Sequence, residues 1–239
     1  MVNNVFELYK INPFNKKSFW TKNTRKVNRL IKMKILVLAS SSQRRIELLR
    51  KLGADFIVIP PRITERIYDD PAKTVLENAF SKANYALVYA PENSIIIGMD
   101  TVIFSHELGV IGKPTTIEEA THILKLLRGK WHSVYTGVYI IEKNNLKYKS
   151  FIEETRVKMR NFSDEELTLY ISSLEPLMKA GGYAIQGLGA LLIETIVGDY
   201  YNVVGIPITK LYITLKKYFG VDLLREAVRK RVVGKTRTI

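Results

Sequence analysis

The chain has 239 residues, with 37 Lys and Arg against 23 Asp and Glu, and a formal net charge of +14. Its hydrophobic content of 46% is enough for a real core, which excludes disorder of the whole chain. Cysteine is absent, so disulfides, thiolate metal sites and cysteine nucleophiles are excluded together. No stretch approaches the roughly 20 apolar residues of a membrane-spanning helix, and no signal peptide is recognisable. We therefore expect a soluble, cytoplasmic protein.

The positive charge is concentrated at the two ends of the chain. Residues 1–32 carry eight bases and one acid, and residues 221–239 carry six bases and two acids. We therefore expect a basic extension at 1–32, a main domain at 33–220, and a basic helix and tail at 221–239. The extension is either disordered or an artefact of a gene start placed before Met33. A basic arm that touches an acidic partner is the alternative.

From Met33 onward, strands alternate with helices. Short apolar strands at 34–39 and 56–59 flank a helix at 43–52. An acidic N-cap and a proline, Asp70-Pro71, begin a long helix. A strand at 94–99 leads into Asp100, followed by an extended pair at 102–104 and 109–111 and a helix at 116–128. The apolar stripe of the long helix consists of Val75, Leu76, Ala79, Phe80, Ala83, Ala86, Leu87 and Ala90.

The second half of the chain begins with two long strands. They cover 132–142 and 146–159, and the turn signal Asn144-Asn145 between them predicts a hairpin. A capping box from Ser163 to Glu166 then begins a helix that must end before Pro176. A glycine-rich, β-like run at 180–207 and helices near 207–218 and 221–231 follow. The whole order predicts an α/β fold.

The segment Ser40-Ser41-Ser42-Gln43-Arg44-Arg45 joins the first strand to the first helix. Free backbone N–H groups, hydroxyls and two guanidiniums at a helix N-terminus form an anion site of phosphate size. Arginines in a first turn oppose the helix dipole, which suggests that an anion offsets them. The alternative is a serine-capped helix with solvated arginines.

Two carboxylates and two lysines are further candidates. Asp100 follows an apolar strand, where it could hold a divalent cation or accept a proton from water. Glu65 is a second metal-directed carboxylate, and Lys82 and Lys113 could neutralise a polyphosphate. Each has an ordinary alternative: a capping aspartate, a charged loop, a snorkelling lysine and a solvated turn lysine.

Gln186 lies among glycines, which let backbone approach a ligand closely, and its amide both donates and accepts, as a pyrimidine edge requires. A tightly turning strand is the alternative. His106, His122 and His132 have no metal-ligand spacing, and we interpret them as structural or exposed. Together the residues suit metal-assisted phosphoanhydride chemistry without identifying it.

Five motifs, in this order along the chain, resemble the Maf (septum-formation) family of nucleoside triphosphate pyrophosphatases. The resemblance runs from about Lys34 to the helix near 215 and covers neither tail. The motifs are Leu38-Ala-Ser-Ser-Ser-Gln-Arg-Arg-Ile-Glu-Leu-Leu-Arg-Lys-Leu-Gly53, Gly98-Met-Asp-Thr101, Gly112-Lys-Pro114, Tyr135-Thr-Gly-Val138, and Ala180-Gly-Gly-Tyr-Ala-Ile-Gln-Gly187 through Asn202-Val-Val-Gly-Ile-Pro207.

The resemblance implies a fold like that of inosine triphosphate pyrophosphatases, with a mixed twisted sheet, flanking helices and a cleft between two lobes. It implies hydrolysis of dTTP and UTP, or of modified pyrimidine triphosphates, to the monophosphate and pyrophosphate with Mg²⁺ or Mn²⁺, by a protein that can form a homodimer. By position, Asp100 is the catalytic proton acceptor. The phosphate-binding residues are Ser42, Arg44, Arg45, Lys82 and Lys113, the specificity residues are Arg44, Thr101 and Gln186, and the metal ligands are Asp100 and Glu65.

This chain departs from the family pattern at two places. Gln43 stands where the family usually has proline, and Thr64-Glu65 stands where it usually has an acidic pair, which weakens the metal assignment there. The alternative functions are a pyrophosphatase for 7-methyl-GTP or a broader set of nucleotides, and a regulatory or nucleic-acid-binding protein. We do not expect nucleic acid to be the main partner, because the middle of the chain is nearly charge-balanced.

Overall fold

We describe the chain from a computed structural model, which places residues 34–235 and the side chains of residues 34–232. The chain divides into two units, residues 1–34 and residues 35–239, and the second contains the sheet and its helices. The predicted extension at 1–32 lies outside the described residues. Among the helices that are described, none is both long enough and apolar enough to cross a membrane.

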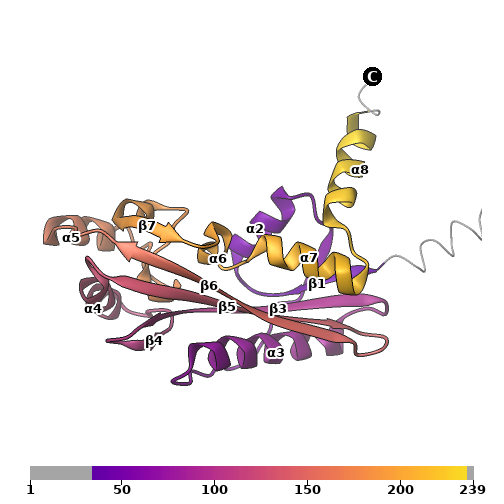
Figure 1. Ribbon diagram of the computed structural model, residues 1–239, viewed down its shortest axis with the longest axis horizontal. Coiled ribbons are helices and arrows are strands. Elements are labelled where there is room, and N and C mark those ends of the chain that lie inside the picture. Colours follow the sequence, from indigo (N-terminus) through magenta and orange to yellow (C-terminus); the bar gives the residue numbers. More distant parts are fainter. Residues whose placement is uncertain (1–33, 236–239) are drawn as a thin grey trace, which may run out of the picture. The chain divides into compact units, whose positions relative to one another are not determined.

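One mixed sheet of seven strands forms the centre of the unit (Figure 1). Its first three strands in space are parallel and the other pairs are antiparallel. The predicted mixed α/β architecture is therefore confirmed. The order in space is β2 (Phe56–Val58), β1 (Ile35–Ala39), β3 (Ser94–Ser105), β5 (Trp131–Glu142), β6 (Tyr148–Met159) and β7 (Ile193–Val197), and β4 (Gly109–Ile111) pairs with β3.

Helices cover both faces of the sheet (Figure 1). One face carries the long helix α3, whose alanines pack on Val37 and Ile96. The other carries α2 and α7, which pack on Ile95, Ile97 and Met99. The helices are α2 (Gln43–Lys51), α3 (Pro71–Tyr89), α4 (Ile117–Leu127), α5 (Asp164–Ser172), α6 (Tyr200–Val204), α7 (Ile208–Phe219) and α8 (Leu223–Lys235).

The helix starts predicted from capping residues are confirmed. The Asp70 side chain accepts a hydrogen bond from the Ala72 N–H at 2.8 Å at the start of α3. At α5, the Ser163 hydroxyl accepts from the Glu166 N–H while the Glu166 carboxylate accepts from the Ser163 N–H. Both pairs satisfy N–H groups that a helix leaves without a partner in its first turn.

Glycines in the sheet allow α3 to lie directly against it. A Cβ atom added to Gly98 would lie 2.2 Å from the Ala79 carbonyl oxygen, and one added to Gly137 would lie 2.5 Å from that of Val75. The buried face of α3 includes the polar residues Thr74, Asn78 and Lys82. Phe80, predicted on the apolar stripe, is 42% exposed and instead meets Tyr139 edge-on.

The prediction that Asp100 ends a strand is wrong. β3 runs on to Ser105 because its other edge stays paired with β5, where Asp100 lies opposite Gly137. On the opposite edge, β1 ends at Ala39 beside Gly98, and β4 pairs with β3 only from Ile103 onward. The stretch of β3 that contains Asp100 therefore has one edge without a partner strand.

The prediction of β structure over 180–207 is largely wrong. Only β7 is a strand, and two 3₁₀ turns, Ala180–Gly182 and Leu188–Leu192, precede it. Gly181 and Gly182 have φ angles of 68° and 74°, in the left-handed region that glycine adopts without strain. The short helix α6 follows β7, and the Asp199 side chain caps it.

The hydrophobic core has two main regions. The first packs α2 and α7 on β1 and β3, and α8 adds Leu223 to it. The second packs α4 and α5 around the far ends of β3, β5 and β6 and includes Tyr183 and Val203. The long strands β3 and β5 belong to both regions, so the two predicted lobes share one sheet.

Candidate active site

A cavity of about 410 Å³ lies where β1 ends and β3 continues without a neighbour on that edge. Its wall includes the Ser40–Arg45 segment, which joins β1 to α2, together with Ile103, Val134 and Tyr183 of the second core region. Every sequence-predicted site residue except Gln186 lies on this wall. Those residues are Ser42, Arg44, Arg45, Glu65, Lys82, Asp100, Thr101 and Lys113.

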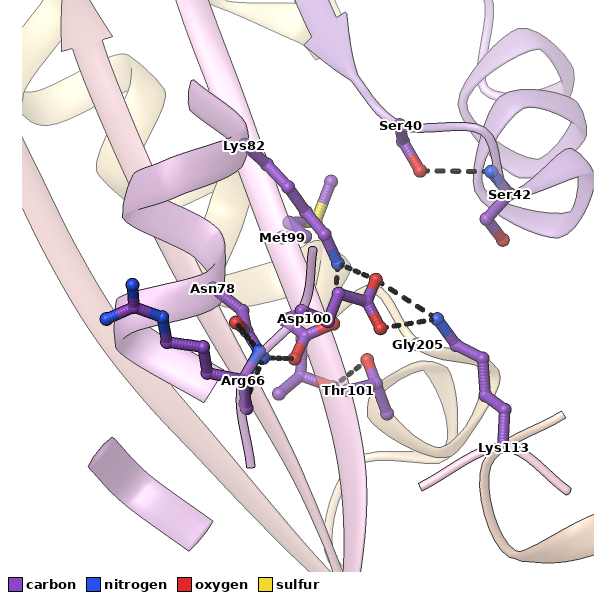
Figure 2. Close-up of polar contacts among 12 residues, drawn as sticks. Ser40, Ser42, Arg66, Asn78, Lys82, Met99, Asp100, Thr101, Lys113 and Gly205 are labelled. Carbon is purple, nitrogen blue, oxygen red and sulfur yellow. Dashed lines mark hydrogen bonds and ion pairs between the residues drawn. The ribbon is translucent and has the colours of Figure 1, made fainter. Parts of the chain in front are cut away.

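Asp100 provides the most deeply buried carboxylate on the cavity wall, and the residue is only 2% exposed to solvent. Its Oδ1 atom lies 2.6 Å from Nζ of Lys82, and its Oδ2 atom accepts a hydrogen bond from Nδ2 of Asn78 at 2.9 Å (Figure 2). Lys82 and Asn78 are one helical turn apart on α3 and therefore reach the same carboxylate. Lys82 is thus a buried, ion-paired lysine and does not snorkel to solvent.

Glu65 extends this pair into a chain of four charges. Its Oε1 atom lies 2.6 Å from Nζ of Lys82, and its Oε2 atom lies 3.0 Å from Nζ of Lys113. Burial alone would raise the pKa of Glu65, but the two ammonium groups outweigh it and lower the pKa to about 2. At neutral pH Glu65 is therefore a carboxylate, as a metal ligand must be.

The turn before α2 lies at the cavity, where the sequence predicts an anion site. Ser42 is the N-cap residue, yet its side chain makes no capping hydrogen bond, and no acidic residue lies in the first turn. The Ser42 N–H instead donates to the Ser40 hydroxyl at 3.1 Å (Figure 2). The Ser42 hydroxyl is thus not used as a helix cap, and Ser42 lines the cavity; its binding to phosphate stays a prediction.

The two arginines of α2 have different environments. Arg45 is buried, and its guanidinium donates to the carbonyl oxygens of Gly205 at 2.7 Å and Met99 at 3.0 Å and to the Thr101 hydroxyl at 2.7 Å. Burial lowers its pKa to about 10. It thus caps the β3 edge left without a partner strand.

Arg44 is half-buried at the cavity wall. Within residues 34–232 its guanidinium makes no hydrogen bond or ion pair. Burial lowers its pKa, and the nearby Glu175 acts in the opposite direction. Of the two arginines, Arg44 is therefore the one whose donors are available to a ligand.

Glu175 organises the turn that carries Gln186. Its carboxylate accepts hydrogen bonds from the N–H groups of Leu188 at 3.0 Å and Gly189 at 2.9 Å and from the Tyr170 hydroxyl at 3.1 Å. Gln186 itself is exposed and does not line the cavity. It lies three residues after Tyr183, which does.

The described residues fit a divalent cation only in part. Asp100 and Glu65 both approach Nζ of Lys82, so their carboxylates are close together. Within residues 34–232 no group of three His, Cys, Asp or Glu side chains is arranged for a metal. Two carboxylates nevertheless suit Mg²⁺, which is commonly held by one or two carboxylates and completed by substrate phosphates and water.

Sequence reasoning missed Asn78 and Lys179. Asn78 interrupts the alanine stripe of α3, and a polar residue on a buried face is the signal that could have identified it. Lys179 lines the cavity and donates to the Glu175 carbonyl oxygen at 2.5 Å, and burial together with Arg44 lowers its pKa. Nothing in its loop sequence distinguishes it from a solvated lysine.

Residues 35–218 match the model of a family described as Maf-like protein. Three proteins named dTTP/UTP pyrophosphatase are similar to this chain. That of Thermoanaerobacter sp. (strain X514) is 47% identical over 79% of this chain and 99% of its own length. That of Thermosipho melanesiensis is 47% identical over 74% and 94%, and that of Bacillus cereus (strain ATCC 10987 / NRS 248) is 42% identical over 80% and 93%.

Two solved structures overlap the chain in part. The nucleoside-triphosphatase / dITP/XTP pyrophosphatase of Mycobacterium abscessus is 13% identical, covers 54% of this chain and 76% of its own, and has a TM-score of 0.37. The Staphylococcus aureus Ham1 protein is 15% identical, covers 62% and 81%, and has a TM-score of 0.40.

Proposed function

The chain belongs to the Maf-like protein family, and from that premise we propose that it hydrolyses dTTP and UTP to the nucleoside monophosphate and pyrophosphate. Relatives with this activity in their names are 47% identical over nearly their whole length, which supports the proposal. The observation at the site that carries it is the buried Asp100 carboxylate, held by Lys82 and Asn78 at the wall of a cavity that also presents Arg44.

In the proposed reaction, a water oxygen forms a bond to the α-phosphorus, and the bond from that phosphorus to the bridging oxygen of the β-phosphate breaks. The Asp100 carboxylate accepts the proton that the water loses, and pyrophosphate departs. Asp100 suits this role because its two oxygens are fixed by different donors and it lines the cavity.

Negative charge accumulates on the departing pyrophosphate, so positioned cations stabilise the transition state most. Lys113 and Arg44 both line the cavity wall, and the N-terminus of α2 presents N–H groups beside the Ser42 hydroxyl. We propose that Arg44 and Lys113 contact the phosphates directly. Arg45, which is bound to three protein acceptors, holds the wall in shape as well as adding positive charge.

Asp100 and Glu65 would hold the divalent cation, Mg²⁺ or Mn²⁺. Such an ion, when bound, offsets phosphate charge and polarises the phosphoryl oxygens. Lys82 pairs with both carboxylates and Lys113 with one of them, so the lysines hold these carboxylates close together.

We propose that Arg44, Thr101 and Gln186 determine which base the site accepts. Thr101 is bound to Arg45, and its hydroxyl oxygen lies 2.9 Å from that of Thr136, which fixes its position on the cavity wall. We propose that Gln186 reads the base edge from its turn and that Arg44 lies between base and phosphates. Pairing of two subunits and a cytoplasmic location stay predictions, and light scattering would test the first.

A panel assay tests the proposed function. The purified full-length chain is incubated with Mg²⁺ or Mn²⁺ and dTTP, UTP, CTP, GTP or 7-methyl-GTP, and pyrophosphate and orthophosphate are measured separately. The proposal requires pyrophosphate release that is fastest with dTTP and UTP. Orthophosphate release would identify a phosphatase, and a preference for 7-methyl-GTP would assign the alternative substrate class. The absence of any turnover would contradict an enzyme and favour a protein that only binds nucleotides.

A further inference from the structure

We propose that Asn78 is a positioning residue that orients the Asp100 carboxylate and ties it to the loop that carries Glu65. The inference rests on the proposed function, because it concerns how Asp100 is presented to the reacting water. Asn78 lies on α3, one turn before Lys82, and is only 4% exposed (Figure 2).

The Asn78 amide uses both its donor and its acceptor groups on two separate segments. Nδ2 donates to Oδ2 of Asp100 and to the Arg66 carbonyl oxygen, each at 2.9 Å, while Oδ1 accepts from the Arg66 N–H at 2.9 Å. Arg66 directly follows Glu65 in the chain. One side chain therefore fixes the loop backbone in both hydrogen-bonding directions and holds the carboxylate on β3.

Packing alone does not explain an asparagine here. Its neighbours on the buried face of α3 include Val75, Ala79 and Ala83, none of which is exposed. A buried amide is costly unless all its hydrogen bonds are made, and an apolar residue would fill the same space without that requirement. The hydrogen bonds to Asp100 and Arg66 are thus what the asparagine contributes.

Asn78 and Lys82 each hold one oxygen atom of the Asp100 carboxylate. Lys82 holds Oδ1 and is shared with Glu65, whereas Asn78 holds Oδ2 and carries no charge. With both oxygens held, rotation of the carboxylate about its Cβ–Cγ bond is restricted. A neutral donor also leaves the net charge of the site unchanged.

Thr74 provides a matched control one turn earlier on the same helix. Its hydroxyl accepts from the Tyr68 N–H at 2.9 Å and can donate to the Tyr68 carbonyl oxygen at 3.1 Å, so it holds the same loop in a similar manner. It is fully buried and makes no hydrogen bond to Asp100. Thr74→Val therefore removes loop attachment without removing a donor from the carboxylate.

The test compares Asn78→Leu with Thr74→Val in the full-length chain, with UTP and Mg²⁺. We expect Asn78→Leu to lower kcat about 10- to 100-fold, as the loss of supporting hydrogen bonds typically does, with KM changed less than about threefold. Thr74→Val should lower Tm but keep kcat within about threefold. Binding of a non-hydrolysable UTP analogue should be similar in both variants, and Asn78→Ala answers the same question if Asn78→Leu does not fold.

A double-mutant cycle separates action through Asp100 from general disturbance. In an Asp100→Asn background, Asn78→Leu should no longer lower the residual turnover, because the group that it orients has lost its function. The inference is overturned if Asn78→Leu lowers kcat no more than Thr74→Val, or if its full effect persists in the Asp100→Asn background. A wild-type chain that releases no pyrophosphate would instead overturn the proposed function, and this inference with it.

Discussion

Nζ of Lys82 on α3 and Oδ1 of Asp100 on β3 lie 2.6 Å apart, and their side chains are 6% and 3% exposed. A buried ion pair contributes little net stability compared with apolar residues, but removal of one partner leaves an uncompensated buried charge. The same ammonium also pairs with Glu65. Lys82 is therefore a structural requirement of the site as well as a candidate phosphate ligand.

The two lysines of the site should differ sharply in their effect on stability. Lys82→Met removes the cation shared by two carboxylates, and we expect it to lower the free energy of unfolding by about 3 kcal/mol. Lys113→Met breaks an ion pair whose side chains are 37% and 39% exposed, and should cost less than about 1 kcal/mol. Urea unfolding without nucleotide measures both. Equal losses would contradict a buried ion pair between Lys82 and the two carboxylates.

Substitutions of the two arginines should also differ in their effects, one on stability and the other on substrate binding. Arg45→Met leaves the carbonyl oxygens of Gly205 and Met99 without their buried donor, and we expect a loss of about 3 kcal/mol in unfolding free energy. Arg44 has no such partner within residues 34–232, so Arg44→Met should stay within about 0.5 kcal/mol. It should instead raise KM for UTP about tenfold or more, because a charged contact to phosphate is lost. An unchanged KM for UTP in Arg44→Met would contradict a direct contact between Arg44 and the phosphates.

Glu175 should control base selectivity through the turn that it holds. Glu175→Gln keeps the shape but cannot accept from both the Leu188 and Gly189 N–H groups, so the turn bearing Gln186 loosens. We expect the preference for UTP over CTP and GTP in kcat/KM to fall about tenfold, because one hydrogen bond to a charged acceptor is worth about 1.5–3 kcal/mol. Glu194→Gln, in an exposed pair with Lys158, is the control. Loss of activity with unchanged preference would contradict the link to base reading.

His132 makes stability depend on pH. It is 3% exposed, its Nε2 atom lies 2.7 Å from the Tyr183 hydroxyl, and burial lowers its pKa to about 4. The unfolded chain, with an ordinary pKa of about 6.5, therefore binds a proton that the folded chain does not, and stability falls as pH drops from about 6.5 toward 4. The loss over that window is on the order of 3 kcal/mol.

Unfolding free energies at pH 7 and pH 5 measure this dependence. His132→Gln should flatten it, whereas His122→Gln, at an exposed position, should not. The same slope in wild type and His132→Gln would assign the pH dependence to other groups.

Local signals predicted most of the fold. The Asp70-Pro71 and Ser163–Glu166 caps begin helices as expected, because their hydrogen bonds are made within four residues. The position of Asp100 could not be predicted, since the continuation of β3 depends on its pairing with β5, a strand about 40 residues away in sequence. The glycine-rich run at 180–192 misled for a related reason: glycines near strand-like residues also suit 3₁₀ turns.

At the site, residue types were easier to predict than their roles. All the predicted residues except Gln186 meet at one cavity. Arg44 and Arg45 are adjacent and chemically identical in the sequence, and they differ because the packing of α2 gives only Arg45 buried acceptors. Asn78 could have been identified as a polar residue on the buried face of α3, but its contact with Asp100 depends on how closely Gly98 and Gly137 let α3 lie on the sheet. Tertiary packing, which a single sequence does not display, decides both.

The measurement that tests the central claim most directly is the fate of solvent oxygen. The wild-type chain hydrolyses UTP with Mg²⁺ in water enriched in oxygen-18, and mass spectrometry locates the label. Attack at the α-phosphorus places the label in UMP and none in the pyrophosphate, and Asp100→Asn should lower the rate of labelling about 100-fold or more while the chain stays folded. Label in pyrophosphate or orthophosphate, or labelling of UMP at an unchanged rate with Asp100→Asn, would contradict the account.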